Sequence, residues 1–214
     1  EICACLVGSE MCIRDRYRGC LYNWYSVNDG TPLPPKYVSS VDCGNFLAAL
    51  MVIRACVPEC ADRAEAMIES ADMSFLQGKN GLLHIGYNVD SGKEDCGLYD
   101  LLGSESALTY LTLIACGKSD KQSYFALSRR SVKAGRKRML ASWSGGAFEY
   151  LLPLLFFRAP EYSLLGKSAF GTLYAQKKYA SRSKSEIWGA SESLYGEKYE
   201  NGDLTVSYTH LRAH

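Results

Sequence analysis

Three glutamates stand among small and aromatic residues, where an ionised side chain is costly to bury. Glu105 follows Leu-Leu-Gly-Ser, Glu149 lies in Ser-Gly-Gly-Ala-Phe-Glu-Tyr-Leu-Leu, and Glu192 lies in Trp-Gly-Ala-Ser-Glu-Ser. A carboxylate in such a setting is retained for a partner or for chemistry. Pairs of carboxyl groups acting as acid, base or nucleophile are typical of glycoside hydrolysis. For Glu149 alone, a buried carboxylate satisfied by an arginine or by backbone donors is an equally good interpretation.

Other catalytic chemistries have little support in the sequence. Of the three histidines, His210 and His214 lie in a C-terminal tail that we exclude from the domain, which leaves His84. A zinc site built on paired histidines is therefore not expected, and a Ser-His-Asp triad would have to use His84. Gly-Lys-Ser occurs at 117–119 and at 166–168, but neither has the upstream glycine of a phosphate-binding loop. We therefore expect no metal and no cofactor.

The composition indicates a globular protein without a strong electrostatic field. The 214 residues are 47% hydrophobic, and 24 Lys and Arg against 23 Asp and Glu give a net charge of +1. The basic run between Arg129 and Arg138 lacks interleaved aromatic residues, so we predict a solvated loop and no nucleic-acid partner. Fifteen Tyr and three Trp suit a sugar-binding cleft, although ordinary core packing would also explain most of them.

Both ends resemble translated sequencing-adapter sequence, so we divide the chain into tails at 1–16 and 206–214 and a domain at 17–205. We expect the tails to pack little against the domain. The six cysteines of the domain contain no Cys-x-x-Cys pair, which predicts reduced thiols of a cytosolic protein. No apolar run reaches the roughly 18 residues that a membrane-spanning helix requires.

The hydrophobic spacing predicts helices, with no sheet larger than a hairpin. Asp42 and Asp100 are the expected N-caps of two of them, and Glu105 would then lie on the inward, apolar stripe of its helix. The Gly-rich segment 75–95 is predicted to be a long ordered loop. The expected helices span 42–56, 59–70, 100–116, 122–127, 146–158 and 161–180.

The residues of several motifs resemble those of one protein family. From about Tyr17 to Thr205, the chain is similar to the glucoamylase-like transglycosylase domain of cyclic β-1,2-glucan synthases. The motifs follow the family's order with similar spacing. They are Tyr22–Tyr25, Pro32–Ser39, Val41–Asn45, His84–Asp90, Tyr99–Leu102, Ser142–Gly145, Phe148–Leu151, and Trp188-Gly189 with Ser191-Glu192-Ser193.

The resemblance implies an all-α fold, an incomplete (α/α) toroid of helical hairpins with long site-bearing loops, and a retaining mechanism. It assigns Glu105 as acid/base and Glu192 as nucleophile, with Glu149 as a substrate- or network-binding carboxylate. Two positions depart from the family: Ala107 replaces the usual Arg, and Gly196 the usual Asn. The other substrate-binding residues implied are Trp24, Asp42, His84, Tyr87, Asn88, Asp90, Trp143, Trp188 and Tyr195.

The resemblance also implies the setting. The implied substrate is β-1,2-glucan. The chain would be a fragment of a synthase that also contains glycosyltransferase and phosphorylase-like regions. In that full-length protein, the domain is expected in the cytoplasm, attached to the inner membrane. About half of a closed toroid is present, so inner helices should expose apolar surface. Two alternatives stay open: a free-standing inverting endo-β-1,2-glucanase, and a non-catalytic glucan-binding fragment. We expect Glu105 and Glu192 to face one cleft lined by Tyr87, Asn88, Trp143 and Trp188.

Overall fold

A computed structural model describes residues 16–135, 137–182, 188–189, 192–198 and 204–208, the last two ranges by their backbone only. The chain divides into two compact units. The first comprises Glu1–Asp100 with Leu108–Ala126, and the second comprises Leu101–Ala107 with Leu127–His214. Each unit is described by itself.

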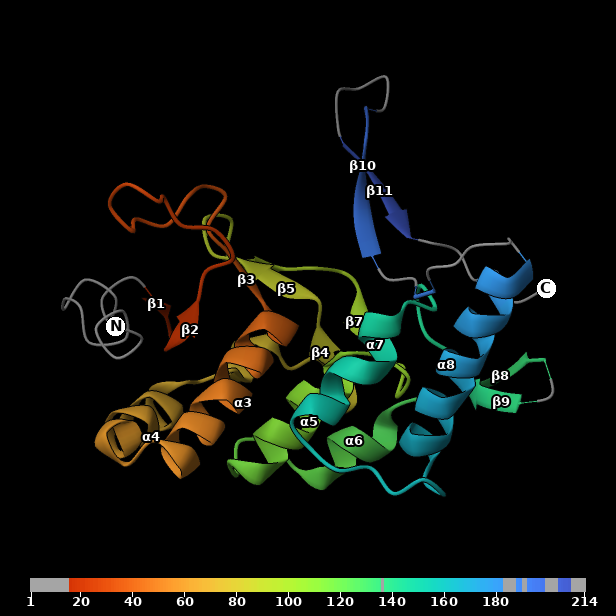
Figure 1. The fold of residues 1–214 in the computed structure, drawn as a ribbon. Helices are drawn as coiled ribbons and strands as arrows, with labels where there is room; N and C mark the ends of the chain where they lie inside the picture. The colour runs from red at the N-terminus through yellow and green to blue at the C-terminus, as the bar shows by residue number, and fades with distance from the viewer. Residues whose placement is uncertain (1–15, 136, 183–187, 190–191, 199–203, 209–214) are drawn as a thin grey trace. The chain divides into compact units, whose positions relative to one another are not determined.

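The first unit is built on a helical hairpin. Helix α3 (Ser40–Cys56) and helix α4 (Ala61–Ser70) lie side by side, joined by the 3-10 turn η1 (Pro58–Cys60) (Figure 1). The helical hairpin predicted from the sequence is therefore confirmed. The N-cap of α3 is Ser39, whose hydroxyl accepts a hydrogen bond from the Asp42 backbone N–H at 3.3 Å. Predicting Asp42 as the N-cap was wrong, because Ser39 satisfies the first turn and places Asp42 inside it.

Helix α5 (Ser106–Ala115) supplies much of the core of the first unit. Tyr110 is fully buried, and its hydroxyl accepts from the Leu83 N–H at 2.7 Å and donates to the Tyr99 carbonyl at 2.8 Å. A Cβ added to Gly44 of α3 would lie 2.0 Å from Thr109 Oγ1, so these helices are in close contact. The shorter helix α6 (Lys121–Ala126) confirms the helix predicted at 122–127.

The first unit also contains short strands. Strand β3 (Tyr37–Ser39) pairs antiparallel with β5 (Gly86–Asn88), which pairs with β6 (Lys93–Glu94). Two hairpins accompany this sheet: β1 (Arg16–Tyr17) with β2 (Cys20–Leu21), and β4 (Leu83–His84) with β7 (Leu98–Tyr99). Two 3-10 turns, η2 (Ser74–Leu76) and η3 (Lys79–Gly81), lie between α4 and β4.

The three-stranded sheet corrects the prediction that no sheet exceeds a hairpin. The segment 75–95, predicted to be a loop, contains β4, β5 and β6. Gly86 permits the pairing of β5 with β3, because a Cβ there would lie 2.1 Å from the Tyr37 hydroxyl. The paired residues Ser39 and Gly86 are far apart in sequence, so local periodicity could not reveal the ladder.

The start of α5 also differs from the prediction, because the helix begins at Ser106 and not after Asp100. Leu101 forms a bridge with Ser128, and the Leu102 N–H donates to the Ser128 carbonyl at 3.0 Å. A Cβ on Gly103 would lie 2.5 Å from the Ala141 carbonyl oxygen. This extended pairing occupies the backbone that a longer helix would need.

The second unit centres on helix α8 (Leu164–Arg182), which confirms the helix predicted at 161–180. The hairpin of β8 (Ser131–Ala134) and β9 (Lys137–Leu140) packs against α8 (Figure 1). The basic run is thus a hairpin and not the loop we predicted, since Met139 and Leu140 anchor its second strand in the core.

The helix predicted at 146–158 is α7 (Ala147–Leu151), followed by the 3-10 turn η4 (Leu152–Leu155). Pro153 has no backbone N–H and cannot continue an α-helix, which explains the early end.

Strand β10 (Glu192–Lys198) pairs antiparallel with β11 (Leu204–Tyr208). Val206, Ser207 and Tyr208 of the predicted C-terminal tail therefore make backbone contacts with β10, and how far residues 206–214 pack against the rest stays a prediction. Residues 1–15 and 209–214 of the predicted tails lie outside the described residues. Within the described part of the chain, no helix combines the length and apolarity needed to cross a bilayer.

Candidate functional site

The predicted site residues are divided between the two units. The first unit holds Trp24, Asp42, His84, Tyr87, Asn88 and Asp90, and the second holds Glu105, Trp143, Glu149, Trp188, Glu192 and Tyr195. The prediction that Tyr87, Asn88, Trp143 and Trp188 line one cleft spans both units and stays a prediction.

In the first unit, Asn23 ties the loop that carries Trp24 to the start of α3. Its side-chain amide donates to Asp42 Oδ2 at 3.2 Å, and its carbonyl accepts from the Ser39 N–H at 2.9 Å. The backbone N–H of Asn23 donates to the Tyr37 carbonyl at 2.9 Å. These bonds fix the backbone directly before Trp24, and half of the Trp24 surface is exposed (50%).

Tyr37 lies beside Trp24 and bonds to a second carboxylate, that of Asp95. The Tyr37 hydroxyl donates a hydrogen bond to the Asp95 side chain. Burial, that hydrogen bond, and the charges of Asp95 and Asp42 raise the pKa of Tyr37 well above its ordinary value. The Asp95 backbone carbonyl is also 2.7 Å from His84 Nδ1. Asp95 therefore connects Tyr37 with His84.

We call Asn23, Trp24, Tyr37, Asp42 and Asp95 the Trp24 cluster. It combines a half-exposed indole with two exposed carboxylates, a combination suited to stacking on a sugar ring and accepting from its hydroxyls. Sequence reasoning named only Trp24 and Asp42 as members. Asn23 and Tyr37 stand in motifs that the sequence singled out, whereas Asp95 has no signal of its own.

Tyr87, Asn88 and Asp90 lie on β5 and the turn that follows it. The Asn88 side chain accepts from the Ser91 N–H at 2.9 Å, and Asp90 Oδ2 accepts from the Lys36 N–H at 2.8 Å. The Tyr87 ring stacks on Tyr17, with centroids 5.7 Å apart and planes 17° apart. Asn88 thus caps its own turn, and Asp90 ties that turn to the backbone before β3. Their contact with a substrate stays a prediction.

In the second unit, the Glu149 carboxylate is 4% exposed and surrounded by donors from the loop before α7. Oε1 accepts from the Trp143 N–H at 2.9 Å. Oε2 accepts from the N–H groups of Ser144 at 3.0 Å and Gly145 at 2.9 Å, and from the Ser144 hydroxyl at 2.6 Å. Backbone donors therefore satisfy this buried carboxylate, in agreement with the second interpretation of Glu149 given from the sequence.

Glu105 is partly exposed and directly precedes the first residue of α5. The prediction that it lies on a stripe inside the helix was wrong, although its place at the N-terminal end is confirmed. Ala107, at the position where a cation was expected, is fully buried. Glu192 begins β10 and Tyr195 lies within it, but their side chains are outside the described part of the structure. The separation of the Glu105 and Glu192 carboxyl groups therefore stays a prediction.

Two tryptophans are exposed in the second unit. Trp143 is 61% exposed and Trp188 is 46% exposed. The ammonium group of Lys177 lies 4.7 Å from the centre of the Trp188 ring, a cation–π contact that restrains this side chain. Both rings offer flat apolar surface, which is what a stacked sugar requires.

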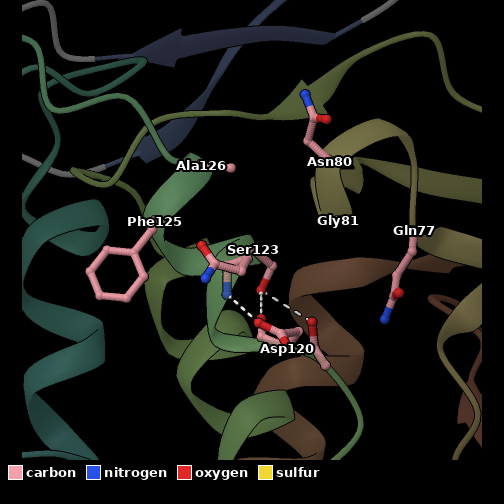
Figure 2. Close-up of a pocket in the computed structure, with 9 residues that line it drawn as sticks. Gln77, Asn80, Gly81, Asp120, Ser123, Phe125 and Ala126 are labelled. Carbon is pink, nitrogen blue, oxygen red and sulfur yellow. Dashed lines mark hydrogen bonds between the residues drawn. The ribbon is translucent and has the colours of Figure 1, made fainter.

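A pocket of about 500 Å³ lies in the first unit between η3 and α6 (Figure 2). Asp120 Oδ1 accepts there from the Gln122 N–H at 2.7 Å, and the Ser123 hydroxyl donates to the Asp120 carbonyl at 2.7 Å. None of the residues predicted for the site lines this pocket, so we assign it no role in the proposed chemistry. The described residues contain no group of three or more His, Cys, Asp or Glu able to hold a metal ion.

Comparisons with known proteins support the resemblance read from the motifs, although no protein-family model matches the sequence. The chain is 33% identical over 166 residues to the cyclic beta-(1,2)-glucan synthase NdvB of Rhizobium meliloti (strain 1021), a match that covers 77% of this chain and 6% of that protein. An endo-beta-1,2-glucanase from Chitinophaga pinensis, in complex with sophorotriose and glucose, is similar in structure, with a TM-score of 0.68 and 15% identity. That alignment covers 88% of this chain and 55% of the glucanase. The chain therefore resembles a short segment of a cyclic β-1,2-glucan synthase and shares its fold with about half of a β-1,2-glucanase.

Proposed function

We propose that this chain is part of a domain that cleaves and rejoins β-1,2-glucan within a cyclic β-1,2-glucan synthase. The observation that carries the proposal is the similarity to such a synthase over 77% of the chain. The fold shared with an endo-β-1,2-glucanase supports the same substrate class. An incomplete (α/α) toroid is the architecture we propose for this fold, in keeping with the packed hairpin of α3 and α4.

The proposed reaction proceeds with retention at the anomeric carbon. Glu192 attacks the anomeric carbon and forms a glycosyl ester while Glu105 protonates the departing glycosidic oxygen. The Glu105 carboxylate then removes the proton from an incoming hydroxyl, whose oxygen displaces Glu192 and restores the glycosidic bond. A hydroxyl of a second glucan gives transfer, a hydroxyl of the same chain gives a ring, and water gives hydrolysis. Retention requires the two carboxyl groups about 5 Å apart.

Substrate binding is assigned to exposed aromatic rings in each unit. In the first unit, Trp24 would stack on a glucose ring while Asp42 and Asp95 accept hydrogen bonds from its hydroxyls. In the second unit, Trp143 and Trp188 offer further stacking surfaces. A chain of linked glucose units needs several such faces, because each unit adds another ring to support.

A hydrolytic alternative has one specific observation in its favour. The solved structure with a similar fold is a glucanase, so a free endo-β-1,2-glucanase with an inverting mechanism is the second candidate. Inversion would leave roughly 6.5 to 9.5 Å between the two carboxyl groups for an attacking water. The products separate the two reactions, because hydrolysis creates one new reducing end per cleavage and transfer creates none.

The test is incubation of the protein with linear β-1,2-glucan, followed by mass spectrometry and a reducing-end assay. We expect redistributed chain lengths and rings, with no matching rise in reducing ends. Shorter chains with a matching rise would favour the glucanase. Binding without any product would favour a non-catalytic glucan-binding fragment, and absence of both would refute the proposal.

Variants of the two carboxylates test their roles. Glu192→Gln should abolish turnover of every substrate, whereas Glu105→Gln should spare an aryl glycoside whose leaving group departs without a proton. The exposed Glu161 supplies the matched control, since Glu161→Gln removes one charge at the surface of the second unit. Equal loss in all three variants would contradict the assigned roles.

A further inference from the structure

The loop before α7 is folded around one side chain. The backbone N–H groups of Trp143, Ser144 and Gly145 all point to the Glu149 carboxylate, at 2.9, 3.0 and 2.9 Å. The Ser144 hydroxyl adds a fourth bond at 2.6 Å. Gly145 has φ +78°, a left-handed conformation that favours glycine, and this turn directs the loop towards the Glu149 carboxylate.

These contacts leave Glu149 little capacity for a ligand. Loop donors make four bonds to this carboxylate, three at Oε2 and one at Oε1, and burial leaves Glu149 only 4% exposed to anything outside the loop. All four partners are donors, so the site requires a group that only accepts. A glutamine in the same place would turn its own amide N–H groups towards backbone N–H groups. Glu149 is therefore matched to the loop and not to a sugar.

The same loop exposes Trp143. Its side chain is 61% exposed, while its own backbone N–H is one of the bonds that Glu149 receives. Charge-assisted hydrogen bonds are roughly twice as strong as neutral ones. An exposed indole on a backbone restrained in this way loses less conformational freedom when a ligand stacks on it.

We propose that Glu149 is a positioning residue for Trp143, and that Trp143 is a stacking platform for one glucose ring of the glucan. The inference rests on the proposed function for its ligand, but the positioning half concerns this chain alone. Glu149 touches neither the substrate nor the reacting atoms in this scheme. It acts through the backbone of the loop that it holds.

The positioning half is tested by fluorine NMR of protein labelled with 5-fluorotryptophan. The chain has three tryptophans, so Trp143→Phe identifies the Trp143 resonance. Glu149→Gln should shift or broaden that resonance and leave those of Trp24 and Trp188 unchanged. Ser144→Ala removes only the hydroxyl donor and should shift the same resonance less. This second variant tests the positioning role if Glu149→Gln does not fold. An unchanged Trp143 resonance in both variants would overturn the inference.

The stacking half is tested by a double-mutant cycle on the affinity for linear β-1,2-gluco-oligosaccharides, measured by calorimetry. We expect Trp143→Ala to raise Kd about tenfold, and Glu149→Gln to raise it by a similar factor. The double variant should bind no more weakly than Trp143→Ala, because Glu149 acts only through that ring. Glu161→Gln should bind as the unmodified protein does.

Two outcomes would count against the stacking half in different ways. Additive losses in the double variant would show that Glu149 affects binding by another route. Absence of glucan binding by the unmodified protein would refute the proposed function and the stacking role together. The fluorine spectrum would still decide whether Glu149 positions Trp143.

Discussion

The rings of Trp24 and Tyr37 lie with their centroids 6.1 Å apart and their planes inclined by 34°. Tyr37 thereby supports one side of an indole that is 50% exposed. Because Tyr37 belongs to β3 and Trp24 to a preceding loop, the contact joins an irregular segment to regular structure. The side chain of Asn23, which directly precedes Trp24, also bonds this loop to Ser39 and Asp42 at the start of α3.

We predict that Asn23→Ala weakens glucan binding several-fold and also lowers stability. The substitution leaves the Ser39 N–H without its acceptor, a loss of about 1–3 kcal/mol for a buried donor. It also frees the Trp24 loop from Asp42. Calorimetry with gluco-oligosaccharides and thermal melting measure the two effects. Asn28→Ala, on the exposed part of the same loop, should change neither, and unaltered binding by Asn23→Ala would count against the Trp24 cluster as a sugar site.

The stability of the second unit should fall between about pH 10 and pH 12 because of Tyr150. Burial raises the pKa of this tyrosine from 10.0 to about 12. Below pH 10 the phenol is neutral in both folded and unfolded chains, so its effect on stability is constant. Above pH 10 the unfolded chain ionises first, and stability is lost until the folded pKa is passed. The expected loss is about 2–3 kcal/mol.

Tyr150→Phe tests this pH dependence by urea unfolding at several pH values. At neutral pH the variant should be less stable, since the Leu140 carbonyl loses the hydroxyl that donates to it at 2.7 Å. Between pH 10 and pH 12, however, its stability should fall less steeply than that of the unmodified protein. Tyr162→Phe is the control, because Tyr162 is 81% exposed. Parallel curves for Tyr150→Phe and the unmodified protein would contradict the prediction.

Gly44→Ala should destabilise the first unit by more than about 2 kcal/mol. The new methyl would meet three atoms of the Thr109 side chain at 2.0–2.6 Å, so α3 and α5 would have to separate. Gly97→Ala is a matched control, because its methyl meets only the end of the Ile85 side chain, which is partly exposed and able to move. Urea unfolding compares the two, and similar midpoints would show that the helix contact is not tight.

The ion pair between Arg54 of α3 and Glu65 of α4 should contribute little to stability. Both side chains are more than a third exposed, at 40% and 43%, so water and salt screen the attraction between them. Arg54→Ala should therefore shift the urea midpoint only slightly, and less so at high salt. A large loss would mean that the pair orders the helical hairpin.

Local patterns predicted the helices well and the pairings poorly. Helices α3, α4 and α8 follow from apolar spacing, since each carries its own periodic signal. The short strands β3 and β5 carry no such signal, because their ladder joins residues from distant parts of the chain. The beginning of α5 was misplaced for the same reason, as Leu101 and Leu102 bond to Ser128.

The candidate site shows the same division. The sequence marked Glu149 as a carboxylate that needs partners, and the partners proved to be the loop just before it. Asp95 gave no such sign, because it stands in an exposed polar stretch and gains its connections only when β4 and β3 bring His84 and Tyr37 near. Residues defined by tertiary contact cannot be found from spacing alone.

The bond between His84 and Asp95 determines which tautomer the imidazole adopts. A backbone carbonyl can only accept, so the hydrogen between His84 Nδ1 and the Asp95 oxygen resides on Nδ1. In the neutral ring, Nε2 is then bare. Such a nitrogen can accept a hydrogen bond from a sugar hydroxyl but cannot donate one to a ring or glycosidic oxygen. His84 would thus favour a glucan pose that turns a hydroxyl towards Nε2 over one that turns a ring or glycosidic oxygen there.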